Sequence, residues 1–150
     1  MTEQDSPALS LIQNSLVPVT RLQAMLMLES GYLWMDLNNF DRAREIFMGA
    51  ISLMPRSEIP QIALGTMEFN LGAHEKALAA FRRAQKINPR SSLVRSHCGE
   101  VLLFMGKVNE ALKELKAAVE IDAYSDGTKF AQALIDAHNV GVLPPLPKAD

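Results

Sequence analysis

The strongest constraint on the fold is a repeating period of about 34 residues, which runs along most of this 150-residue chain. Residues of matching size recur at this spacing in separate columns: Gly31, Gly65 and Gly99; Ala43, Ala77 and Ala111; Ala50, Ala84 and Ala118; Phe47, Phe81 and Leu115; Pro55 and Pro89. A fixed period of this length is typical of repeat arrays, whose units bury their apolar faces against neighbouring units. The chain is therefore predicted to be an array of repeats.

Each unit is interpreted as two helices joined by a tight turn. In the middle unit, apolar residues follow helical spacing over 59–70 and again over 74–87, with Leu71-Gly72 between them. Asn88-Pro89 ends the second helix, because a residue before proline avoids the α region and proline cannot continue the hydrogen-bond ladder. Helices are expected over 92–105 and 108–121 in the next unit. Ser57 and Ser91 are expected to cap the helices that follow them.

The glycine and alanine columns are explained by packing. Gly31, Gly65 and Gly99 are predicted to lie where the first helix of each unit meets the second helix, with the column of Phe47, Phe81 and Leu115 filling the space beside them. These columns are therefore no evidence of chemistry.

Composition excludes several classes of protein. Hydrophobic residues make up 48% of the chain, which is enough for a buried core. A net charge of −2 does not suit a protein that binds nucleic acid by neutralising phosphates. The single cysteine cannot form an internal disulfide, and no apolar stretch reaches the roughly 20 residues that a membrane helix needs. A cytoplasmic protein without membrane insertion or nucleic-acid binding is expected.

A search for catalytic and metal sites finds no constellation. None of His74, His97 and His138 has a second ligand at metal-site spacing, so no metal is expected. The stretch from Gly99 to Gly106-Lys107 departs from the phosphate-loop spacing. No catalytic residue and no cofactor is predicted, and we expect the chain not to be an enzyme.

The repeat resembles the tetratricopeptide repeat, a helix–turn–helix unit of about 34 residues. The middle unit matches its consensus at Leu64-Gly65, at Ala77 and Phe81, and at Ala84 and Pro89. The resemblance implies an all-α fold: a right-handed α-solenoid of three units, at about 24–57, 58–91 and 92–125, with a capping helix at about 126–139. This domain would span 20–139. Residues 1–19 would be a partly disordered segment with a short amphipathic helix over 8–16, and 140–150 a flexible proline-rich tail.

In arrays of this family, one face of each first helix lines a concave groove. Projection of the three helices places thirteen residues there: Met25, Leu28, Tyr32, Met35, Ile59, Ile62, Thr66, Phe69, Asn70, Leu93, His97, Glu100 and Phe104. Most are apolar, as an extended peptide or an amphipathic helix would require, and packing inside a unit does not explain them. The groove is therefore predicted to bind a protein client with an apolar segment. Alternatively, it is covered by residues 8–16 or by a second copy of the chain in a homodimer.

Two narrower resemblances bear on the client. Family members that grip chaperone C-termini clamp a carboxylate with lysine, arginine and asparagine, and the matching positions here hold Leu28, Tyr32, Ala63, Leu93 and His97. That clamp is absent. The arrangement of a short leading segment, three repeats and a final helix, with the run Ser96–Leu103 followed by Gly106, is similar to the bacterial type III secretion chaperones, which hold hydrophobic export substrates.

A second function remains open from sequence. A scaffold or structural subunit of a larger assembly would use its convex or terminal faces instead of the groove. The basic run of Arg82, Arg83, Lys86 and Arg90 is interpreted as a solvated helix face, although it could also contact an acidic partner.

Overall fold

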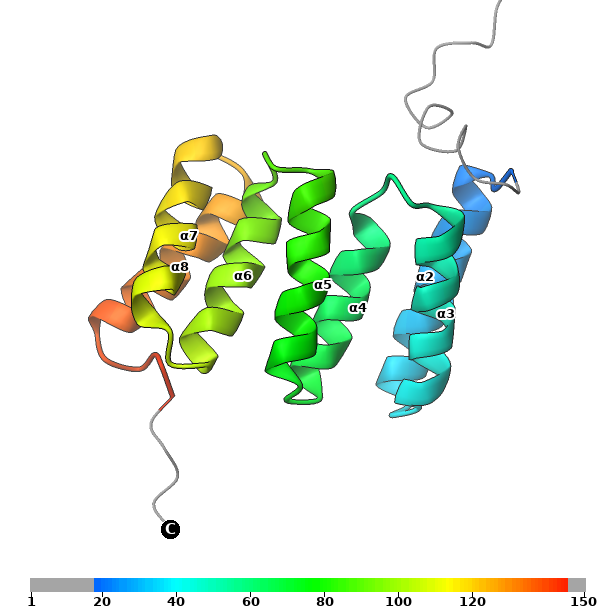
Figure 1. The fold of residues 1–150 in the computed structure, drawn as a ribbon, viewed down its shortest axis with the longest axis horizontal. Helices are drawn as coiled ribbons and strands as arrows, with labels where there is room; N and C mark the ends of the chain where they lie inside the picture. The colour runs from blue at the N-terminus through cyan, green and yellow to red at the C-terminus, as the bar shows by residue number, and fades with distance from the viewer. Residues whose placement is uncertain (1–17, 146–150) are drawn as a thin grey trace, which may run out of the picture.

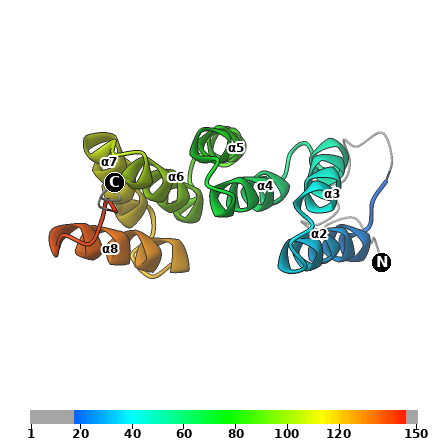
Figure 2. The ribbon, with the colours of Figure 1, turned by 90° about the horizontal axis from the view of Figure 1, so that it is seen from below.

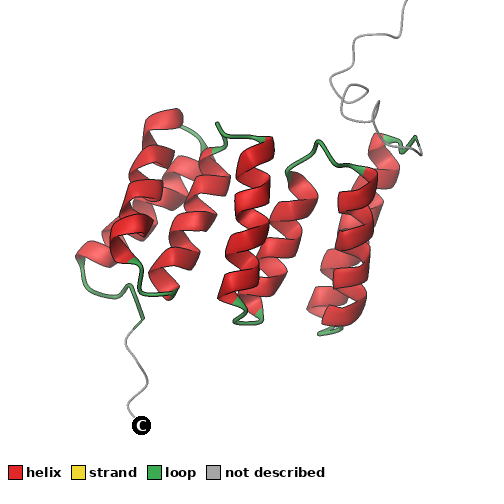
Figure 3. Ribbon diagram, viewed as in Figure 1, coloured by secondary structure: helices red, strands yellow, loops and turns green. Residues whose placement is uncertain are grey.

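The computed structural model describes residues 18–145, and within that range the chain forms seven α-helices and no strand. The helices are α2 (Arg21–Asp36), α3 (Phe40–Leu53), α4 (Ile59–Asn70), α5 (His74–Ile87), α6 (Ser92–Phe104), α7 (Val108–Ile121) and α8 (Asp126–Asn139) (Figures 1 and 3). The all-α repeat architecture is confirmed. The helix predicted over 8–16 lies outside the described residues.

Consecutive helices form antiparallel pairs that follow one another in a row (Figure 1). Seen from below, α3, α5 and α7 form one layer, and α2, α4, α6 and α8 form the other (Figure 2). The second layer bends, so that α2 and α8 at its ends project beyond α4 and α6. We call this inner side of α2, α4, α6 and α8 the concave face.

The turn inside each unit depends on a left-handed residue just after the first helix. Gly72 and Gly106 both have φ +74°, and Asn38 takes the equivalent place with φ 58°. Asparagine is among the few residues other than glycine that adopt this conformation readily. The apolar residues before them, Leu37 and Leu71, are the C-caps of α2 and α4.

The helix starts follow the predicted serines with one exception. Ser91 accepts a hydrogen bond from the Val94 N–H at the start of α6. Ser57 was expected to do the same for α4, but the N-cap of that helix is the next residue, Glu58. The difference has a simple cause: Pro60 has no N–H to donate, so the Ser57 hydroxyl accepts instead from Ile59 N, at 3.3 Å.

The glycine column marks the contact within each helix pair, as predicted. A Cβ placed on Gly31, Gly65 or Gly99 would lie 2.3, 2.6 or 2.5 Å from an atom of Phe47, Phe81 or Leu115 respectively. Those three large residues are buried at the centre of their helix pairs. Glycine therefore lets the large side chain of the second helix lie directly against the backbone of the first.

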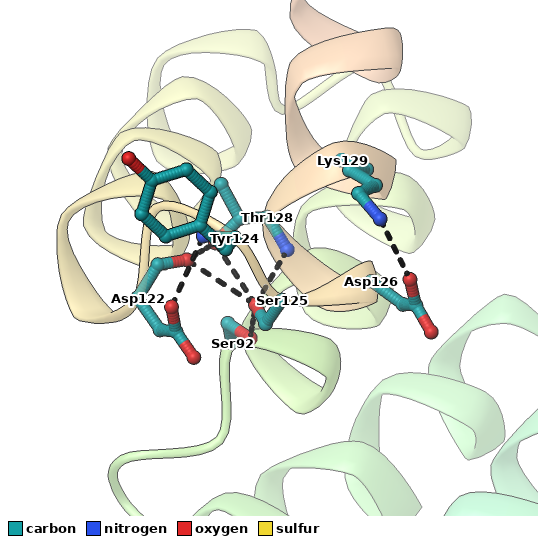
Figure 4. A network of polar contacts seen from close by, with 7 residues as sticks. All are labelled: Ser92, Asp122, Tyr124, Ser125, Asp126, Thr128 and Lys129. Carbon is teal, nitrogen blue, oxygen red and sulfur yellow. Dashed lines mark hydrogen bonds and ion pairs between the residues drawn. The ribbon is translucent and has the colours of Figure 1, made fainter.

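The last helix continues the register of the repeats. Ser125 caps α8 by accepting from Thr128 N at 3.1 Å, and it extends the column of Ser57 and Ser91 by one unit. Its hydroxyl also lies 2.7 Å from the hydroxyl of Ser92, which joins the starts of α6 and α8 (Figure 4). The capping helix thus occupies the place of the first helix of a fourth unit.

The first residues after α8 pack against the helices of the array. Leu143 packs against the apolar cluster around Leu102, Leu115 and Leu134, and its carbonyl oxygen is 2.8 Å from His138 Nδ1. The flexible tail was predicted to begin at 140, yet residues 140–143 are held to the array. Residues 146–150 lie outside the described range. No helix within 18–145 is both long enough and apolar enough to cross a membrane.

Candidate functional site

The concave face is built from one helix per unit because the second helices cover the other side of the array (Figure 2). Equivalent positions of successive units repeat along it. Met25, Ile59 and Leu93 occupy the same helix position and are 52%, 52% and 39% exposed. Each of the three first helices therefore presents one large apolar side chain to solvent at the same height.

At the N-terminal end of this face, three of the predicted residues also pack against the hydrophobic core. Leu28, Tyr32 and Met35 of α2 are half-buried and pack against the cluster that contains Phe47. The Tyr32 ring meets the Phe47 ring edge-on, with centroids 5.3 Å apart. Burial raises the pKa of the Tyr32 hydroxyl, and the nearby Glu29 carboxylate adds to the effect. The inference that packing does not explain this part of the strip was therefore wrong.

The middle of the face holds an aromatic cluster. Phe69 of α4 and Phe104 of α6 meet edge-on with centroids 5.0 Å apart. The ring of His74, at the start of α5, lies 5.4 Å from Phe69 and 5.8 Å from Phe104. Phe104 is 37% exposed, so the cluster forms an apolar surface that bridges two units.

The other predicted residues of α4 differ in how far they reach solvent. Ile62 is half-buried and packs against the apolar cluster that contains Phe81. Thr66 is half-buried as well, whereas Asn70 is exposed at the last residue of the helix. Ile59 therefore remains the most accessible apolar side chain that α4 offers to a partner.

A shallow hollow adjoins the aromatic cluster at the turns between helices. Its volume is about 520 Å³. It is lined by Gly72, Ala73, His74, Glu75, Lys76 and Met105. Within the described range, His74 Nδ1 is buried without a hydrogen-bond partner.

The C-terminal end is organised around His97. Its ring stacks on Phe81 of α5, with centroids 4.8 Å apart and planes 5° apart, and meets Phe130 of α8 at 5.3 Å. Its Nδ1 lies 3.5 Å from a carboxylate oxygen of Glu100. The half-buried His97 and Glu100 therefore place polar groups among the apolar side chains at the C-terminal end of the concave face.

The positions of the carboxylate clamp contain no lysine or arginine. Ala63 is fully buried, and Leu93 presents an apolar side chain. Glu100 adds a negative charge near His97. The structure therefore presents mostly buried and apolar side chains at these positions.

The cysteine and two of the arginines are buried or paired inside the array. Cys98 is fully buried, and burial raises the pKa of its thiol to about 11, so it stays protonated at neutral pH. Arg82, predicted to be solvated, is bound instead to Glu114 of α7, and Arg95 donates to the same carboxylate at 2.9 Å. In residues 18–145, no three His, Cys, Asp or Glu side chains are grouped to hold a metal ion.

A comparison with family models identifies one unit of the array. Residues 61–91, which include α5 and most of α4, match the tetratricopeptide repeat model. This segment is a tetratricopeptide repeat. The three helix pairs and the column of Gly31, Gly65 and Gly99 extend this unit to both sides.

A similar human protein is much longer than this chain. The human protein O-mannosyl-transferase TMTC1 is 30% identical over 87 residues, which cover 58% of this chain and 10% of that protein. The chain thus spans a tenth of the relative's length.

Two solved structures share the fold. The Yersinia enterocolitica type III secretion chaperone SycD, in complex with a peptide of the translocator YopD, has a TM-score of 0.69 at 15% identity, and the match covers 81% of this chain and 95% of that chain. The first tetratricopeptide repeat domain of Spaghetti (RPAP3), bound to the HSP90 peptide SRMEEVD, has a TM-score of 0.64 at 19% identity, with coverage of 78% and 97%.

Two residues of this repeat protein's concave face were missed from sequence. Phe130 lies in the predicted capping helix, yet its ring meets that of His97. His74 joins the aromatic cluster from the second helix of its unit. The repeat register places Phe130 in the column of Leu28 and Ile62, both predicted face residues, so extending the period into α8 would have found it. No comparable signal marks His74.

Proposed function

We propose that this protein is a non-enzymatic binding module that takes an apolar segment of a protein client on its concave face. The observation that carries the proposal is the ladder of Met25, Ile59 and Leu93, one exposed apolar side chain per unit at the same helix position. Exposed apolar side chains gathered along one face are a common feature of interaction sites. A chain laid across three first helices would cover all three residues at once.

The aromatic groups supply the deepest contacts for such a segment. Phe104 is partly exposed beside Phe69, and Phe130 beside His97 encloses the other end. Burying an aromatic or large aliphatic side chain contributes roughly 1.5–3 kcal/mol. Several client side chains placed on these groups and on the ladder therefore suffice for micromolar binding, which corresponds to about 8 kcal/mol with the costs of association included.

The charge of the face favours an apolar client over an acidic tail. The RPAP3 domain binds the peptide SRMEEVD, whereas the clamp positions here carry Leu28, Tyr32, Ala63, Leu93 and His97. An acidic terminus would lie beside Glu100 and against apolar side chains, at a cost in desolvation without a compensating lysine or arginine. A client helix or strand with apolar residues and neutral or basic flanks suits the surface better.

The narrower form of the proposal is a cytoplasmic chaperone that keeps a hydrophobic export substrate soluble. The similarity in fold to the SycD structure with its YopD peptide supports this form, as does the apolar concave face. It requires a client that is secreted and that aggregates when its chaperone is removed.

The test compares two substitutions of exposed apolar residues. Ile59→Glu introduces a charge on the concave face, at the first residue of α4, where an acidic residue suits the helix dipole. Met48→Glu makes a similar change at a residue 50% exposed on α3, in the outer layer. Circular dichroism checks that both variants keep their helices.

Affinity capture with mass spectrometry then compares both variants with the unmodified chain, and fluorescence anisotropy measures binding of the client's apolar segment. We expect Ile59→Glu to weaken that binding by at least about tenfold, which is about 1.4 kcal/mol, and Met48→Glu to leave it unchanged. The peptide SRMEEVD should bind none of the three chains. Equal binding of the client segment by all three would move the function to another face.

A further inference from the structure

One side of α2 carries a stripe of leucines that nothing in the described chain covers. Leu22, Leu26 and Leu33 are 64%, 60% and 58% exposed, and Leu37 at the C-cap is 61% exposed. Their spacings of four, seven and four residues place them on a single side of the helix. We call these four residues the end stripe. It is distinct from the concave-face residues of the same helix.

At two of its four positions, the equivalent residues of the other units are buried, whereas Arg56 and Arg90 at the Leu22 position and Leu71 at the Leu37 position are exposed. In the repeat register, Leu26 corresponds to Pro60 and Val94, and Leu33 corresponds to Met67 and Val101. All four counterparts have less than 2% of their surface exposed. Leu26 and Leu33, at the middle of the end stripe, therefore continue an internal interface of the array.

The covering element in those units is the second helix of the preceding unit. Met67 of α4 belongs to one apolar cluster with Ala43 and Phe47 of α3. Val94 and Val101 of α6 share a cluster with Ala77, Phe81 and Ala84 of α5. By the same rule, the end stripe of α2 requires a helix that comes before it in the chain.

The chain enters α2 through a boundary like those of the later units, although it lies about one helical turn earlier in the repeat register. Pro18-Val19-Thr20 precedes α2, and Pro89-Arg90-Ser91 precedes α6. Thr20 and Ser91 both cap their helices by accepting from the third N–H, each at 3.2 Å. The linkers before α4 and α6 are residues 54–58 and 88–91, so a linker of matching length before α2 ends a preceding helix near residue 16.

Residues 8–16 have the apolar spacing of such a helix. Leu9 and Leu16 stand nine and two residues before Pro18. The same two distances before Pro55 and Pro89 are occupied by apolar residues of the second helices: Ile46 and Leu53, and Ala80 and Ile87. Ile12 completes an apolar stripe at helical spacing.

We propose that residues 8–16 form a helix that covers the end stripe of α2 and takes the place of the second helix of a preceding unit. The occupant is this chain's own segment, because only the short linker that ends in Pro18-Val19-Thr20 separates residues 8–16 from α2. The concave face remains open in this arrangement, so the proposal does not rest on the client-binding function.

The test is a double-mutant cycle on the full chain. Ile12→Asp changes the segment, Leu33→Asp changes the stripe, and Met48→Asp is the matched control at an exposed residue of α3. Circular dichroism gives the melting temperature of each variant, and sedimentation velocity gives its oligomeric state.

The expected result is that Ile12→Asp and Leu33→Asp each lower the melting temperature by about 4–8 °C, as the loss of one buried side chain in a domain of this size would. The double variant should lose no more than the larger single loss, because both changes break one contact. The chain should sediment as a monomer throughout.

Three outcomes would overturn the proposal. If Leu33→Asp had no larger effect than Met48→Asp, the stripe would be uncovered. If Leu33→Asp acted alone, without coupling to Ile12→Asp, another element would cover it. If the chain were a dimer that Leu33→Asp dissociates, the occupant would be a second copy of the chain.

Discussion

Glu114 forms the ion pairs that link the second and third units. Its carboxylate accepts from Arg82 of α5 and Arg95 of α6, and Gln85 Nε2 donates to it at 3.3 Å. The Glu114 side chain is only 14% exposed. Burial acts to raise the pKa of the carboxyl, but the two arginines outweigh burial and lower it overall. Losing the carboxylate would leave two half-buried arginines without their partner.

The lowered pKa predicts a dependence of stability on pH. A carboxyl whose pKa is lower in the folded chain contributes stability that is complete above its unfolded value, near 4.5, and is lost as the pH falls through the folded value. At pH 7 we expect Glu114→Gln to reduce the free energy of unfolding by about 2 kcal/mol. The deficit should shrink as the pH falls below about 4.5.

Urea unfolding of both chains between pH 7 and pH 3 measures this deficit. The exposed carboxylate of Asp126, which pairs with Lys129 at 3.2 Å, supplies the control Asp126→Asn, for which only a small loss of stability is expected. A deficit for Glu114→Gln that stayed constant over the whole range would show that the ion pairs do not stabilise the fold.

Among the elements, the two helices of a unit are held together by contact between a glycine and a large side chain. Gly65→Ala would place a Cβ 2.6 Å from the buried Phe81 ring, so we expect a loss of about 1–3 kcal/mol in the free energy of unfolding. Gly49 of α3 is the matched control, because a Cβ there meets only the flexible end of Met27 at 3.0 Å.

Gly49→Ala should be neutral or should stabilise the chain by up to about 1 kcal/mol, since alanine favours a helix over glycine. Thermal and urea unfolding give both values. If Gly65→Ala were tolerated as well as Gly49→Ala, the contact with Phe81 would not explain the glycine column.

Helix pairs are the part of this fold that sequence predicts well, because each constraint is local or periodic. The boundaries of α4, α5 and α7 follow from Gly72, Asn88-Pro89 and the apolar spacing, and the structure confirms them. The cap of α4 was assigned to the wrong residue, because the effect of Pro60 depends on which N–H groups remain free to donate.

The concave face was less predictable, because exposure depends on contacts between helices. Projection of a helix selects the correct side, yet it cannot show that Tyr32 rests on Phe47 or that His97 stacks on Phe81. Nor does the period reveal His74, which reaches the face from a second helix. The same difficulty applies to the basic run, whose first arginine finds its carboxylate partner on another helix.

At the scale of the whole molecule, burial is uneven along the array. Within the described range, α2 has one buried residue, Gly31, whereas α6 has eight. A repeat protein is stabilised by its units and by the interfaces between neighbours, so its ends can open separately from its middle.

Hydrogen exchange measured along the chain checks this gradient. The amides of α2 should exchange at least about tenfold faster than those of α6, which corresponds to about 1.4 kcal/mol of additional local stability. Met67 and Val101, which are fully buried in the central interfaces, mark the region where protection should be greatest. Uniform protection from α2 to α8 would mean that the array opens only as one cooperative unit.

The serine that starts α8 has a consequence for how such a chain can grow. Ser91 and Ser125 begin consecutive first helices at the same step, and the hydroxyl of Ser92 contacts that of Ser125. The sequence between the two caps is therefore a complete module with compatible ends. Duplicating residues 92–125 in place would lengthen the concave face by one helix while retaining a serine cap at each join. Gene duplication could thus extend the reach of the binding surface without redesigning either terminus.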